Sequence, residues 1–253
     1  MKRILTLLLA LTLICCMLAS CAATPEQIIE KADAALAEAP YKMTVKMDFQ
    51  CDNKIVNEIF SAMNLEIPVI IDGDNLSMDM SMTVMEYSTT AKMTVVDKVM
   101  YYDIEMMGQS FKMKATMNDE EYQEFLEENN TQMMLTPDNF ENLKIEAKDG
   151  KQYISCTGIN SDGLDELEDA IDGALNSIGG KATIDNVSFV LVLNDGKYES
   201  MDMSCTYTVS ANNESFTVTL NVGTDFSYDN VASITAPADA DKYKDADFGD
   251  LFG

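Results

Sequence analysis

Several segments of this chain alternate between apolar and polar residues, and this alternation constrains the fold more than any other feature. In 41–49 every second residue is apolar, and the residues between them are lysine, threonine or aspartate. The segment 76–84 repeats the pattern with leucine, methionine and valine. Successive side chains of a β-strand point to opposite faces, so a period of two predicts strands with one buried face. Similar patterns predict further strands at 67–71, 90–96, 99–106, 111–117, 187–193, 201–209 and 216–222, and a hairpin at 143–148 and 152–157.

Tight turns and a few helices complete the expected fold. Asp72-Gly73, Asp149-Gly150 and Asp195-Gly196 are typical of short connections between antiparallel strands. Apolar residues at helical spacing predict helices at 25–39, 118–130 and 161–179, and 55–65 reads as a short helix or a loop. We therefore expect an α+β fold, an antiparallel β-sheet with helices packed on one face.

The first helix has a defined start. Thr24 is placed to act as N-cap, Pro25 as the first helical residue and Gln27 as the third residue of a capping box. The order of elements also hints at two halves, 25–117 and 161–236, although no residue-level repeat supports them.

The N-terminal segment has the layout of an export signal. Lys2 and Arg3 precede an apolar run over 4–18, which is too short to span a bilayer of about 30 Å. The run ends in Leu18-Ala19-Ser20-Cys21, which resembles the lipobox of bacterial lipoproteins. The resemblance implies cleavage before Cys21 and attachment of a diacylglycerol group to its sulfur. Two acyl chains give stable anchoring, so we expect a membrane-anchored protein on the extracytoplasmic face of a bacterial cell membrane.

This interpretation divides the chain into four parts. We expect a signal peptide at 1–20, a short tether at 21–24, one α+β domain at 25–237 and an acidic, flexible tail at 238–253. The short tether would keep the domain close to the membrane.

The charge of the chain excludes some partners. The 17 basic residues include Lys2 and Arg3, so the chain after the leader has 15, against 43 acidic residues, and a formal charge of −28. Nucleic-acid binding depends on Lys and Arg that neutralise phosphates, so we expect no nucleic-acid partner. The same charge argues against attraction to anionic head groups.

The composition also argues against catalysis. Histidine is absent, which removes Ser-His-Asp and Cys-His systems and imidazole-based metal sites. We find neither a phosphate-binding glycine loop nor a Gly-x-Ser-x-Gly motif. The aspartates of the tail lack the order of a calcium loop and are read as a solvated end. We therefore expect no enzyme activity, no cofactor and no metal.

Methionine is the most unusual component. Of 19 methionines, 17 follow the leader, and many share the apolar face of expected strands. Methionine is flexible and polarisable, so these residues could line a deformable apolar groove, hold copper(I) through thioethers, or form an ordinary core. The candidate ligand-lining residues are Met43, Val45, Met47, Met78, Met80, Met82, Met113, Met117, Met201 and Met203.

Three cysteines follow Cys21 in the sequence. Cys156 and Cys205 both fall in expected strands and could form a cross-strand disulfide, while Cys51 would stay free. The alternative is that all three are small buried apolar residues.

The layout resembles the LolA/LppX-like lipoprotein-carrier family. The matching features are the helix 25–39 that leads directly into the strand 41–49, the successive meander strands, the interposed helices and the closing Ile234-Thr235-Ala236-Pro237. The resemblance implies that the α+β domain is a curved antiparallel half-barrel, whose concave apolar face is covered by helices and can hold lipid. The predicted function is thus a lipoprotein that binds a lipid or other hydrophobic ligand in a Met-rich apolar groove. The alternative is a non-enzymatic structural or interaction module of the cell envelope with a closed core.

Overall fold

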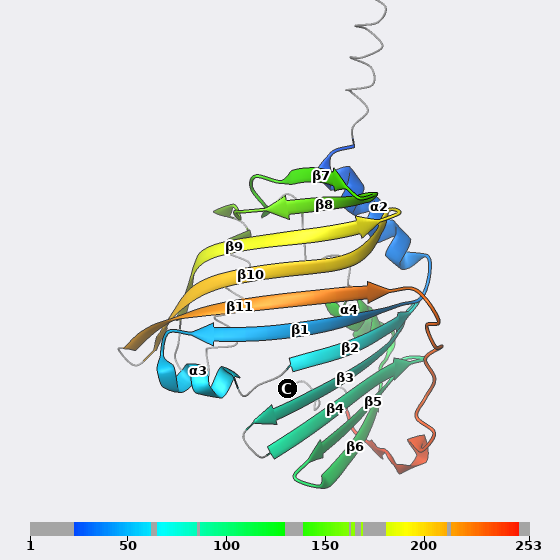
Figure 1. Cartoon of the computed structure of the whole chain (residues 1–253). Coiled ribbons are helices and arrows are strands. Elements are labelled where there is room, and N and C mark those ends of the chain that lie inside the picture. Colours follow the sequence, from blue (N-terminus) through cyan, green and yellow to red (C-terminus); the bar gives the residue numbers. More distant parts are fainter. Residues whose placement is uncertain are drawn as a thin grey trace, which may run out of the picture.

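A computed structural model shows one open, curved and mainly antiparallel β-sheet with a few helices (Figure 1). It describes residues 23–61, 65–84, 87–129, 139–161, 163–164, 168, 181–211 and 214–247. The prediction of an antiparallel β-sheet with a few helices is therefore confirmed. The leader, Cys21, residues 248–253 and most of the predicted helix 161–179 lie outside the described residues.

The sheet has twelve strands in the order β12-β6-β5-β4-β3-β2-β1-β11-β10-β9-β8-β7. The strands are β1 (Tyr41–Cys51), β2 (Leu65–Asp72), β3 (Asn75–Val84), β4 (Tyr87–Val96), β5 (Val99–Met106), β6 (Gln109–Thr116), β7 (Lys144–Lys148), β8 (Lys151–Cys156), β9 (Lys181–Asn194), β10 (Lys197–Ala211), β11 (Glu214–Ser227) and β12 (Lys244–Asp245).

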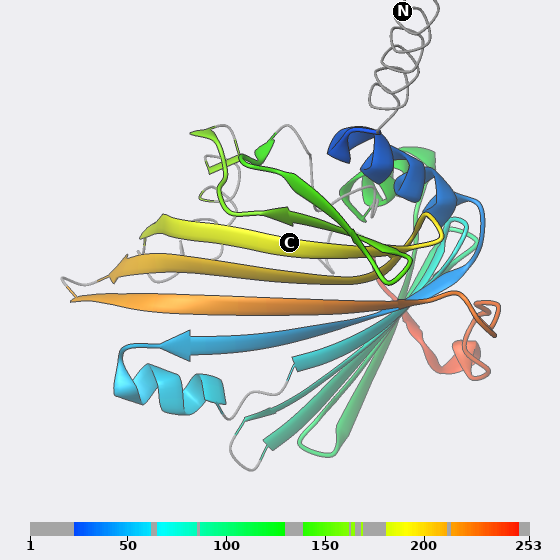
Figure 2. The same ribbon diagram turned by 45° about the horizontal axis from the view of Figure 1, so that its top comes forward.

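Two meanders meet at the middle of the sheet. Strands β1 to β6 form one and β7 to β11 the other, and they join where β1 pairs antiparallel with β11 (Figure 2). The central pairing connects the first strand with the last long one, so Val45 lies opposite both Thr224 of β11 and Ile67 of β2. The two halves of the open sheet are therefore joined by a contact between distant parts of the sequence.

Helix α2 (Pro25–Ala37) begins as the sequence predicts. The Thr24 hydroxyl accepts a hydrogen bond from Gln27 N at 3.4 Å, and Gln27 Oε1 accepts one from Thr24 N at 3.2 Å. These bonds satisfy backbone donors that the first turn leaves free. Ile29 and Ala32, on its apolar side, are buried against the half of the sheet formed by β8 to β10.

Helix α4 (Asp119–Asn129) packs on the other half of the same face. Tyr122 and Phe125 are 6% and 5% exposed and pack with Met93 and Met100 of β4 and β5. Asn118 caps the helix by accepting from the backbone N–H groups of Glu120 and Glu121. Helix α3 (Lys54–Ser61), where we expected a helix or a loop, lies beside the end of β1, with Phe60 against Phe49.

The C-terminal segment differs from expectation. We predicted a flexible tail from residue 238, but residues 239–245 are docked on the sheet. A 3₁₀ turn (Ala240–Lys242) is followed by β12, which pairs parallel with β6, and Tyr243 is 7% exposed. The sequence does not indicate this docking, because acidic residues surround Tyr243, the one aromatic residue of 239–245.

Candidate functional site

The strand registers place the predicted methionines on one face of the sheet. Met43 lies opposite Val69, which lies opposite Met78, and Met78 in turn lies opposite Met93. Residues directly opposite in antiparallel strands project to the same side. Helices α2 and α4 cover this side, which we call the inner face. All nine of the predicted ligand-lining residues that lie in strands occur at its positions, namely Met43, Val45, Met47, Met78, Met80, Met82, Met113, Met201 and Met203.

Part of this inner face is a packed core. Met78 and Met117 pack with Met93, Met100 and α4, although Met117 lies just after β6 rather than in it. Met201 and Met203 pack beneath α2 in the cluster that contains Ile154 and Phe189. These side chains fill space between the sheet and the helices.

Another part of the inner face is less covered. Met47, Met80 and Met82 are only half-buried, and they lie toward the strand ends remote from α4. Farther along the same face, at the end of the β5–β6 hairpin, Met106 and Phe111 are 45% and 47% exposed. These two residues were not among the predicted set, although Met106 continues the alternation of β5.

One polar contact fixes α2 to the sheet from the edge of the inner face. Tyr198 of β10 donates a hydrogen bond from Oη to Asp33 Oδ1 at 2.6 Å, and its ring stacks on Phe226 at 5.4 Å. Burial raises the pKa of Asp33, an effect that the Tyr198 hydroxyl partly offsets. Burial and the neighbouring Asp33 raise the pKa of Tyr198 well above its ordinary value. No sequence pattern identifies this pair, because its members are 165 residues apart.

The predicted disulfide is wrong. Cys156 of β8 lies opposite Phe189 of β9, and Cys205 of β10 lies opposite Val187 of β9. A whole strand thus separates the two cysteines, which places them about 10 Å apart across two strand spacings. A disulfide needs Cα atoms within about 7 Å. Cys51, Cys156 and Cys205 are all free thiols.

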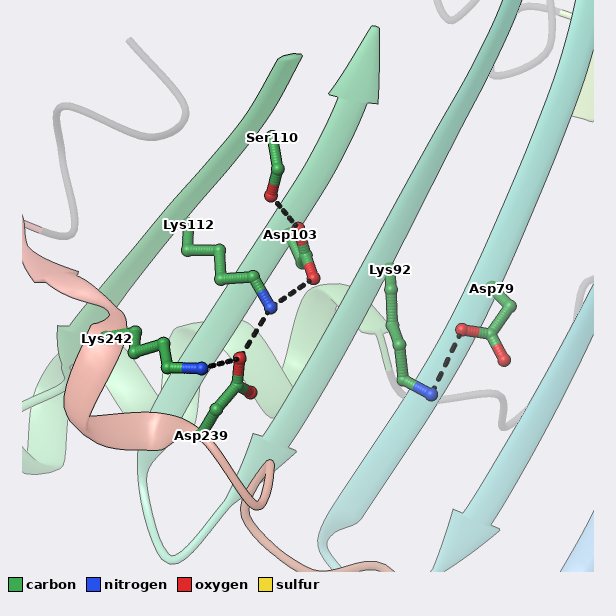
Figure 3. A network of polar contacts seen from close by, with 7 residues as sticks. All are labelled: Asp79, Lys92, Asp103, Ser110, Lys112, Asp239 and Lys242. Carbon is green, nitrogen blue, oxygen red and sulfur yellow. Dashed lines mark hydrogen bonds and ion pairs between the residues drawn. The ribbon is translucent and has the colours of Figure 1, made fainter. Parts of the chain in front are cut away.

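On the opposite, outer face, the C-terminal segment is held by a network of ion pairs (Figure 3). Lys112 Nζ of β6 lies 3.0 Å from Asp103 Oδ2 of β5 and 2.9 Å from Asp239 Oδ2 of the C-terminal segment. Lys242 adds a longer contact to Asp239. The hydrogen bonds that Lys112 donates to these two aspartates raise the pKa of Lys112, and Lys112 lowers the pKa of Asp239.

Two polar pockets also lie outside the inner face. One, of about 380 Å³, lies between the outer face and residues 232–239, and Thr94, Lys92 and Tyr243 contribute to its wall. The other, of about 690 Å³, lies beside α3 near Asn57. Neither is lined by a methionine. The part of the chain that the structure describes contains no group of three or more Asp, Glu, Cys or His placed to hold a metal ion.

Comparisons with known proteins do not extend this description. No family model and no curated protein matches the chain. Among solved structures, acetoacetate decarboxylase from Legionella pneumophila subsp. pneumophila str. Philadelphia 1 is similar over 77% of this chain and 87% of its own, with 10% identity and a TM-score of 0.10. A TM-score this low carries no argument about fold or function. Within the described residues, no helix combines the length and apolar character needed to cross a membrane.

Proposed function

We propose that this protein is an extracytoplasmic lipoprotein, anchored through Cys21, that binds a lipid or another hydrophobic ligand on the Met-rich inner face. The observation that carries the proposal is the register, which gathers methionines from β1, β3, β6 and β10 on one face of a curved sheet. Unbranched thioether side chains can rearrange around apolar molecules of varied shape. We further propose that the half-barrel belongs to the LolA/LppX-like type, and that the protein has no enzymatic activity.

The part of the inner face that the helices cover least is the proposed entry for the ligand. Half-buried Met80 and Met82 share this face with Met106 and Phe111, which are exposed at the hairpin end. An apolar ligand that removed these side chains from water would gain about 25 cal/mol for each Å² buried.

The anchor is tested separately in a bacterial host. Cys21→Ser should block lipidation, so the variant should neither incorporate labelled palmitate nor partition with membranes. The matched control is Cys51→Ser, which leaves the lipobox intact. If Cys21→Ser protein were still labelled and membrane-bound, the anchor proposal would be wrong.

Ligand binding is tested on the chain that begins at position 21 and carries Cys21→Ser, because every described helix and strand lies within it. Native mass spectrometry should find co-purified lipid, and the uncharged dye phenylnaphthylamine should bind with increased fluorescence. Met80→Gln with Met82→Gln should weaken dye binding by about tenfold, because two amides replace apolar contacts. The control is Ser81→Gln, which places the same amide on the outer face of the same strand. Neither retained lipid nor dye binding would overturn the proposal.

A second candidate function is a structural or interaction module of the cell envelope with a closed core. It is favoured by the packing of Met78, Met93, Met100 and Met117 against Tyr122 and Phe125. In that case the Met80 and Met82 variants would leave dye binding unchanged, and the protein would be recovered with an envelope polymer or protein instead.

A further inference from the structure

Charged side chains are almost absent from the inner-face positions of the ten strands β1–β6 and β8–β11. The one exception at these register positions is Glu214, at the exposed first residue of β11. The lysines of these strands project to the outer face, as Lys46, Lys92 and Lys112 do in their ion pairs. The sheet therefore offers a ligand on its inner face no cation that would neutralise an acid.

Charged groups also approach this side from other elements. Lys98, in the turn between β4 and β5, lies over the ring of Tyr122 but is already paired with Asp119 of α4. Two others are carboxylates. Asp33 of α2 accepts the hydrogen bond of Tyr198. Glu168 accepts a bond from Ile184 N at 3.0 Å, through Oε1. Both would repel an anionic head group. Moving an ionised carboxylate out of water without a partner is strongly unfavourable.

The Thr224 hydroxyl is a buried polar atom on the inner face. Only 2% of the residue is exposed, and Oγ1 makes no hydrogen bond to any residue that the structure describes. Thr224 sits near the centre of the sheet, between Val45 of β1 and Met201 of β10. A buried hydroxyl without a partner destabilises the protein, and an acceptor on a ligand would remove that cost. A ligand reaches this hydroxyl when packed neighbours move aside, and Met201, which is 5% exposed, has a flexible side chain.

We infer that the inner face selects uncharged amphiphiles, of the acylglycerol ester class, over fatty-acid anions, and that the Thr224 hydroxyl donates to the ester carbonyl of the ligand. This inference rests on the proposed function of ligand binding. The charge-free strands set the class of ligand, and Thr224 supplies the polar contact that orients it.

The test is displacement of bound phenylnaphthylamine from the Cys21→Ser chain by two lipids with the same acyl chain, monoolein and oleate. Measurements at about pH 8 keep a free carboxyl group ionised. Monoolein should displace the dye at a concentration at least about tenfold lower than oleate, because only oleate must bury a charge. Thr224→Val should weaken monoolein binding by about fivefold, the effect of one hydrogen bond, and leave dye affinity unchanged. Thr224→Ser, which keeps the hydroxyl, should bind as the parent protein does.

A stability measurement distinguishes a role of Thr224 in ligand binding from a purely structural role. Without lipid, Thr224→Val should unfold at a higher urea concentration than the parent, because it removes an unsatisfied polar atom and keeps the shape. Equal or tighter binding of oleate would overturn the inferred ligand class, and unchanged monoolein affinity in Thr224→Val would overturn the role of the hydroxyl. In both cases the dye still binds and the proposed function stands. Absence of dye binding would overturn the proposed function itself.

Discussion

The bond between Tyr198 and Asp33 connects helix α2 to the sheet through a half-buried carboxylate. Burial raises the pKa of Asp33, so the folded protein binds this proton more readily than the unfolded chain does. The free energy of unfolding should therefore fall as the pH rises from about 4 through the folded-state pKa. At neutral pH the folded protein holds Asp33 as an ionised carboxylate, which lowers the free energy of unfolding. The hydrogen bond that Tyr198 donates reduces this loss.

Substitutions at this pair should change the pH dependence of stability. Asp33→Asn keeps an acceptor for Tyr198 and removes the titration, so the decline in stability above about pH 4 should be reduced. Tyr198→Phe removes the donor and should lower the free energy of unfolding at neutral pH by about 1–2 kcal/mol. Urea unfolding over a series of pH values checks both, with Glu38→Gln at the exposed end of α2 as control. An unaltered pH profile in Asp33→Asn would contradict this account.

The three free cysteines should differ in reactivity. Cys156 and Cys205 are buried, and burial raises the pKa of both thiols, that of Cys205 to about 11. Thiolates are the reactive form, so these two should be inert in the native protein, whereas the half-buried Cys51 should react. A thiol-reactive chromophore added to the Cys21→Ser chain should modify one thiol under native conditions and all three after denaturation. Modification of fewer than three thiols in denaturant without reductant would instead reveal a disulfide.

At the scale of elements, local patterns predicted most strands, and failed where the pattern itself breaks. Strand β9 begins at Lys181, six residues before the predicted start at Val187. The register of β9 and β10 shifts between Thr206 and Tyr207, opposite Asp185 and Asn186, so the alternation loses its phase there. The face of each methionine followed from the period of two. The sequence did not predict which helix would cover each methionine, because helix packing is set by contacts between distant residues.

The C-terminal segment depends on one aromatic anchor. Tyr243 is buried, with its ring edge-on to Tyr101 at 5.4 Å and Lys112 Nζ over its face at 5.2 Å. Tyr243→Ala should release residues 239–245, with a loss of about 1–3 kcal/mol because a terminal segment can detach without leaving a closed cavity. Hydrogen exchange should speed up in β12 and along β6. Asp241→Ala, at an exposed position of the same segment, should leave exchange unchanged, and equal protection in both variants would refute the anchor.

Acid should release the same segment. Lys112 holds the pKa of Asp239 below its ordinary value, so the ion pair contributes stability at neutral pH that is lost as the pH falls through the folded-state pKa. Hydrogen exchange of β12 should therefore accelerate at low pH in the parent protein. Asp239→Asn should remove this acid sensitivity, and an unchanged acid response in that variant would contradict the assignment.

At the scale of the whole molecule, the sheet is held together by contacts that no local pattern contains. The sequence hinted at two halves, and the structure shows two meanders whose strands join where β1 pairs with β11. Each half has its own cluster, one beneath α2 around Ile154 and one beneath α4 around Met100. The ion pair between Lys46 and Asp225 at the junction spans 179 residues of sequence. Pairing over such distances is reached late and slowly in folding.

This topology predicts that the two halves unfold together, and that the junction controls both. The chain has no tryptophan, so Phe140→Trp in the α2 cluster and Tyr102→Trp in the α4 cluster give one reporter for each half. In urea, both reporters should give coincident transitions. Val45→Ala at the buried junction should lower the midpoint of both equally, by about 1–3 kcal/mol in unfolding free energy. Lys46→Ala, on the outer face of the same strand, should move neither, because exposed ion pairs contribute little. Separate transitions, or a shift in one reporter alone, would mean that each meander is stable by itself and that β1 joins two independent units.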